Sequence, residues 1–244
     1  MPTVPVNVVF REPVAIEVPN DIVAMALGFT KTQAVEGQAI EYYIKNRRSN
    51  PEHTDDDVCI SKISEWAANR FLVDRYGFPP TEVDWAVRFA RLKGWAEDLI
   101  YMVSSRRLAV HVKSTPMLYD DGKPTWTFQL GNEHDNYGVD PLLRDKVKGF
   151  TRTMFSVTHT AVAINADNDI TVGTYVPGID SKASTMPTGV VVYIYQVLWW
   201  KDVIERIGLR DPINPFFNGI KICLYYNDAV RYYGDITKPL APIP

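Results

Sequence analysis

The chain changes character near Trp95. Before this residue, apolar side chains recur at helical spacing; after it, short runs rich in Val, Ile, Thr and Tyr are separated by turn residues. The pattern predicts helices over about 21–47, with an interruption near Gly28, and over 54–76, followed by a shorter helix over 81–94. A chain that supplies helices first and strands afterwards is expected to form an α/β (α+β) sheet domain with helices gathered on one side.

Runs with the length and composition of strands follow one another after this point: 95–103, 108–115, 125–130, 158–165, 170–176, 190–198 and 220–226. We expect the first three to form a meander and the next two a hairpin. A short helix is expected over 201–207. The proline-rich first twenty residues suit an edge strand or an arm.

Composition limits the class of protein. The 244 residues include 46% hydrophobic and 23% charged residues, which is typical of a globular domain and excludes disordered and fibrous chains. No apolar run approaches the ~20 residues that span a bilayer, and no secretory signal pattern is present, so we expect no membrane partner and a cytoplasmic location, in the host cytoplasm if the chain is viral. Cys59 and Cys223 lie among apolar residues and are expected to be buried free thiols.

The run 108–113 carries the sharpest local signal for chemistry. Its period-two alternation puts Leu108, Val110 and Val112 on one face, and His111 and Lys113 on the other. A lysine in the middle of a sheet is costly unless its amine reaches water or a partner. Asp98, on the preceding run, is the candidate partner; the alternative is a half-exposed strand with a solvated lysine.

Glu65 is a second candidate. It lies mid-helix between Ile63 and Trp66, so it is either partly buried and directed at the same place as Asp98, or a surface glutamate paired with Lys62 or Asn69. The spacing alone leaves both alternatives open.

Four segments, 62–68, 97–101, 110–115 and 126–129, contain in this order a helix glutamate, a strand aspartate, a His-Val-Lys-Ser-Thr run and a Trp-Thr-Phe-Gln run. This series resembles the PD-(D/E)XK superfamily of restriction-endonuclease-like proteins, many of them from phages and mobile elements. The segments 160–164 and 170–177 are similar to the strand pair that follows in such proteins, so the resemblance covers about 62–177.

The resemblance implies a restriction-endonuclease-like mixed central β-sheet flanked by helices, with additional C-terminal strands. The whole chain, 1–244, would be one nuclease-like domain. It would comprise a core over about 54–177, an N-terminal helical arm over 1–50 and a C-terminal strand extension over 178–244.

It also implies a metal-dependent nuclease that hydrolyses DNA. Glu65 and Asp98 would bind Mg or Mn, because hard divalent cations prefer oxygen ligands, and Lys113 would orient the attacking water or offset charge on the phosphate. Gln129 would be an auxiliary catalytic residue near the substrate.

His111 departs from the family pattern, which has Glu or Asp two residues before the lysine. An imidazole can bind a metal, but it suits Zn, Mn or Ni better than Mg. Three outcomes stay open: an active site with His111 as a metal ligand, an active site that recruits another carboxylate such as Glu97, or a protein without catalysis.

The expected partner is DNA, contacted by basic and hydroxyl residues on either side of the centre, Arg88, Arg91, Lys93, Ser114 and Thr115. The net charge of −3 is unusual for such a binder. Two other hypotheses therefore stand beside the nuclease: a catalytically inactive relative that binds DNA or a partner protein, and a viral structural or host-interaction protein. A homodimer is also left open.

Overall fold

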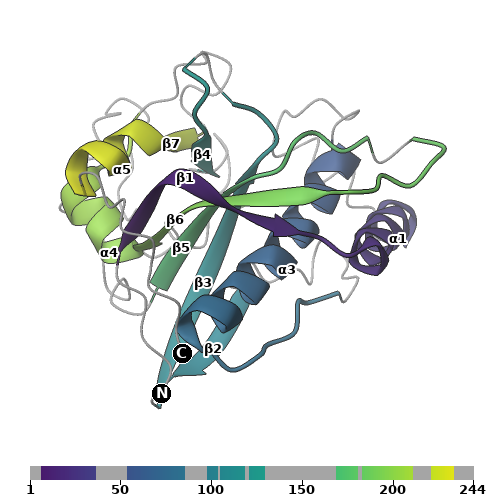
Figure 1. The fold of residues 1–244 in the computed structure, drawn as a ribbon, viewed down its shortest axis with the longest axis horizontal. Coiled ribbons are helices and arrows are strands. Elements are labelled where there is room, and N and C mark those ends of the chain that lie inside the picture. Colours follow the sequence, from purple (N-terminus) through teal and green to yellow (C-terminus); the bar gives the residue numbers. More distant parts are fainter. Residues whose placement is uncertain are drawn as a thin grey trace.

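The computed structural model describes residues 7–36, 54–85, 98–103, 105–118, 121–129, 169–180, 183–210 and 221–233. Over these ranges the chain is a mixed α/β protein: a five-stranded mixed sheet, a separate two-stranded sheet and four α-helices (Figure 1). The expected α/β class is confirmed.

The five-stranded sheet has the order β1 (Val8–Glu17), β6 (Val191–Trp199), β5 (Asp169–Tyr175), β3 (Arg106–Thr115) and β2 (Leu99–Val103). All neighbours are antiparallel except β3 and β5, which are parallel. The expected edge strand near the N-terminus is confirmed, since β1 borders only β6 among the described strands.

Two helices, α1 (Asn20–Glu36) and α3 (Thr54–Tyr76), pack together, and α3 lies across one face of this sheet (Figure 1). The predicted bounds of α3 are confirmed, and Gly77 ends the helix at a φ of +64° that favours glycine. The predicted interruption at Gly28 is wrong, because α1 runs through it; one glycine costs only ~1 kcal/mol in a helix interior. None of the described helices has the length and apolar character needed to cross a bilayer.

The predicted three-stranded meander is wrong. β4 (Thr125–Gln129) leaves the large sheet and pairs antiparallel with β7 (Lys221–Tyr225), while the free edge of β3 is taken by β5. β5 is buried along most of its length, with Ile170 and Val172 fully inaccessible, so it suits an interior position. Both edges of β5 are occupied, by β3 and β6; its predicted hairpin partner, 158–165, lies outside the described residues.

The helix predicted over 81–94 is also absent as far as the structure describes that segment. Residues 77–85 are irregular, and 86–94 lie outside the described ranges. Here Asn69 of α3 donates a hydrogen bond from Nδ2 to the Thr81 carbonyl at 2.6 Å, and Val83 is buried, so tertiary contacts fix this segment in a non-helical form.

The C-terminal part contains α4 (Trp200–Asp202), a π-helical turn η4 (Val203–Ile207) and α5 (Tyr226–Tyr233). The short helix expected over 201–207 is confirmed, as are both late strands, whereas α5 was not predicted. α5 and η4 lie together at one end of the molecule, near β7 and β4 (Figure 1).

The two sheets meet where Trp126 of β4 lies against Gly173 of β5. The indole Nε1 donates a buried hydrogen bond to the Thr174 carbonyl at 2.9 Å. A Cβ on Gly173 would lie 2.6 Å from Cζ2 of Trp126 and 2.7 Å from Cγ of Gln196, closer than atoms can approach. Glycine is therefore required at this position for close approach of the two layers.

Substitution of Gly173 by Ala tests this contact. We expect the variant to lose roughly 1–3 kcal/mol of unfolding free energy, since the indole has to shift within a packed interior. Urea denaturation measures the loss. Gly28→Ala is the control: nothing lies within 4 Å of its Cβ position, so this helix-interior change is expected to stabilise the chain by up to ~1 kcal/mol. A Gly173→Ala midpoint equal to that of the wild type would contradict the packing described here.

Candidate functional site

The alternation predicted in β3 is confirmed. Leu108, Val110 and Val112 are buried in the core that includes α3. His111 and Lys113 lie on the opposite face of β3, which is directed at the two-stranded sheet. His111 is only 3% exposed, and Lys113 is half-buried, with its Nζ 5.3 Å from the centroid of the Phe128 ring of β4. An ammonium over an aromatic face is attracted by the ring quadrupole, so Lys113 is held between the layers.

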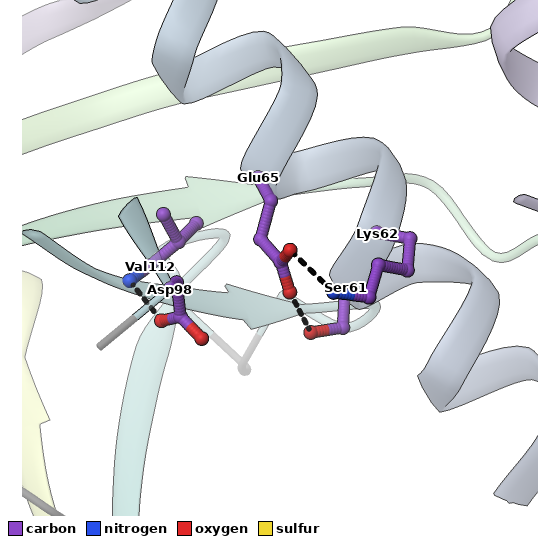
Figure 2. A network of polar contacts seen from close by, with 5 residues as sticks. All are labelled: Ser61, Lys62, Glu65, Asp98 and Val112. Carbon is purple, nitrogen blue, oxygen red and sulfur yellow. Dashed lines mark hydrogen bonds and ion pairs between the residues drawn. The ribbon is translucent and has the colours of Figure 1, made fainter. Parts of the chain in front are cut away.

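Asp98 lies where the ladder between β2 and β3 ends. Leu99 pairs with Val110, so the next position places Asp98 beside His111. Its Oδ2 accepts a hydrogen bond from the backbone N–H of Val112 at 2.7 Å (Figure 2). The carboxylate thus takes the place of a strand carbonyl and satisfies an amide that would otherwise lack its sheet partner.

Glu65 meets each alternative left open by the sequence only in part. It is buried, with 4% exposure, and it is also paired with Lys62, whose Nζ lies 2.6 Å from Oε2. The Ser61 hydroxyl donates to Oε1 at 3.5 Å, so the carboxylate is turned toward residues of its own helix (Figure 2). α3 packs on the face of β3 opposite to that of Lys113, so Glu65 and Lys113 belong to different layers.

The donor atoms decide which cation this region could hold. Within the described ranges, no group of three or more His, Cys, Asp or Glu side chains is arranged to hold a metal ion. Mg²⁺, however, is commonly bound by one or two carboxylates together with water and substrate phosphate. The hard oxygen donors of Glu65 and Asp98 fit such a cation, provided that Glu65 turns from Lys62.

Several predicted site residues receive no test. Arg88, Arg91 and Lys93 lie outside the described residues, as does Glu97, and Gln129 ends β4 with its side chain outside them. Ser114 is half-buried. Thr115 is buried; its hydroxyl donates to the Met117 carbonyl at 3.1 Å, which indicates a role in ending β3.

Two buried polar residues that lie on the same face of the sheet as Lys113 were not identified from the sequence. Thr171 pairs with His111 across the sheet, and Gln196 pairs with Gly173, the neighbour of Lys113. Both are fully buried, and neither the Thr171 hydroxyl nor the Gln196 amide has a hydrogen-bond partner among the residues that the structure describes. A lone glutamine within an apolar strand was the available signal, but its position relative to Lys113 depends on the strand order.

The two cysteines are free and buried, as predicted. Burial, with a smaller contribution from the Asp56 charge, raises the pKa of Cys59 to about 12. Because only the thiolate is nucleophilic, Cys59 is inert at neutral pH despite its place on the same helix as Glu65.

Comparisons of this chain with protein-family models, curated proteins and solved structures find no match. The class that the fold defines is therefore a mixed α/β protein with a buried helix glutamate and an aspartate at a strand end. The more particular likeness, to PD-(D/E)XK nucleases, rests on the motif series alone.

Substitutions of Asp98 separate its structural from its electrostatic contribution. Asp98→Ala leaves the Val112 amide without this acceptor and is expected to cost roughly 1–3 kcal/mol of unfolding free energy. Asp98→Asn keeps an acceptor oxygen and should cost less. Hydrogen exchange of the Val112 amide, with urea denaturation, measures both.

The matched control is Asp74→Ala on the exposed side of α3, where the surface pair with Arg70 contributes at most ~1 kcal/mol. Equal protection of the Val112 amide in the wild type and in Asp98→Ala would show that the hydrogen bond is not formed.

Proposed function

We propose that this chain is a metal-dependent nuclease that hydrolyses phosphodiester bonds in DNA, with a restriction-endonuclease-like core. The observation that supports it best is the buried charge of Glu65 near the strand pair that carries Asp98. A buried ion pair contributes little net stability, because desolvation offsets most of the attraction. A role in binding a cation therefore accounts for Glu65 better than a structural role does.

In this proposal Glu65 and Asp98 hold Mg or Mn. His111, whose imidazole suits Mn, lies on the face of β3 opposite to α3, so it would reach the cation only from the side of Asp98. A cation bound there would polarise the phosphate and lower the pKa of a bound water. The hydrogen bond from Val112 fixes one oxygen of Asp98 in place. In this proposal the Lys113 ammonium leaves the Phe128 ring and offsets the charge that develops on a phosphate bound on its own face of β3.

The surrounding residues would position the substrate. Arg88, Arg91 and Lys93 are proposed to contact the phosphate backbone, with Ser114 and Thr115 beside Lys113. Contacts of this kind fix the orientation of a duplex without determining sequence preference. Gln129 would approach the substrate from the end of β4.

A cleavage assay tests the nuclease. Purified protein is expected to cut plasmid or linear DNA with Mg or Mn, and Asp98→Asn or Lys113→Ala should lower the rate at least about a hundredfold, since each removes a charge that acts on the reacting phosphate. The controls are Asp74→Asn and Lys31→Ala, which change exposed residues of α3 and α1. Cleavage that survives in both centre variants would refute this site.

A second candidate is a non-catalytic relative that binds DNA. It is favoured by the contact of Lys62 with Glu65, which already neutralises one proposed metal ligand, and by His111 at the place of a carboxylate.

This candidate predicts DNA binding in EDTA, a steep loss of affinity with added salt and no cleavage with Mg, Mn or Zn. Fluorescence anisotropy with a labelled duplex, followed by gel analysis of the same samples, measures both properties. Metal-dependent cleavage that disappears in Asp98→Asn would exclude it.

A further inference from the structure

Lys62 is held from two sides. Its Nζ lies 2.6 Å from Oε2 of Glu65 and 5.3 Å from the centroid of the Phe29 ring, which belongs to α1. The side chain of Lys62 is 15% exposed and that of Glu65 is 5% exposed, so the pair is largely shielded from water. An ordinary surface pair at this spacing lacks the aromatic contact and the burial.

We propose that Lys62 is a built-in counterion that competes with a divalent cation for the carboxylate of Glu65. This inference rests on the proposed metal-binding role of Glu65. A lysine ammonium and a divalent cation cannot share one carboxylate oxygen, because two cations in contact in a partly buried site repel each other strongly. Binding of the cation at Oε2 therefore requires Lys62 to leave this oxygen.

The Phe29 ring helps to hold Lys62 beside Glu65, because an aromatic face attracts an ammonium. The Ser61 hydroxyl is 3.5 Å from the other carboxylate oxygen. Without metal, Lys62 thus balances the charge of Glu65, and it lowers the affinity of the centre until a cation displaces it.

Titration of the full chain with Mn²⁺ alone, without DNA, tests this role. Free Mn²⁺ is measured by electron paramagnetic resonance. Lys62→Met, which keeps the length and removes the charge, is expected to bind Mn²⁺ roughly tenfold more tightly, or better, since one competing charge at contact is gone. Lys62→Arg keeps a cation and should bind as weakly as the wild type.

Phe29→Leu provides a test that leaves the ion pair in place. Without the ring, Lys62 loses one of the two contacts that hold it beside Glu65, so the affinity for Mn²⁺ is expected to rise severalfold. Lys31→Met on exposed α1 is the charge-matched control and should change nothing. Circular dichroism of every variant checks folding.

The outcomes separate this inference from the proposed function. If Lys62→Met and the wild type bind Mn²⁺ equally, and Glu65→Gln abolishes the binding, the counterion role is wrong and the metal centre stands. If neither the wild type nor Lys62→Met binds Mn²⁺, both proposals fail. Tighter binding by Lys62→Met and by Phe29→Leu supports the competition.

Discussion

The contact between the Trp126 indole and the backbone at Gly173 is the constraint on which the layered arrangement depends. Only a residue without a side chain lets the ring lie this close to β5, and the hydrogen bond to Thr174 satisfies the indole N–H in the interior. The same contact holds β4 over the face that carries His111 and Lys113, and it brings the Phe128 ring to the Lys113 ammonium. The environment of the lysine is thus set by sheet packing rather than by its own strand.

Asp98 and Glu65 illustrate how charged groups are accommodated near the core. Asp98 completes the hydrogen bonding of β3 just before β2 begins. Glu65 is paired with Lys62 on the same helix, α3. Each carboxylate is therefore satisfied by the protein itself, which is what keeps two charged groups tolerable near a core. The proposed exchange of Lys62 for a cation would replace one balanced arrangement by another.

The sequence predicted those features that depend on near neighbours in the chain. The bounds of α3 follow from local start and stop signals, and the two faces of β3 follow from alternation. The prediction of a meander is wrong because the partners of β3 and β4 are decided by packing between segments far apart in the sequence. These partners, β5 and β7, lie far along the chain from them. For the same reason the bond from Val112 to Asp98, and the nearness of Gln196 to Lys113, could not be derived from spacing.

The pairing of β1 with β6 joins Val8 to Val197, two residues far apart in the chain, in a single ladder. During synthesis on a ribosome, β1 emerges early yet finds its neighbour only after β6 has followed, whereas α1 and α3 can already meet. The entropy lost in closing so long a loop is offset only by the contacts that form with the sheet. Although β1 precedes the other described strands in the chain, it therefore joins the sheet late. A chain cut short before β6 would leave β1 without the neighbour it has here.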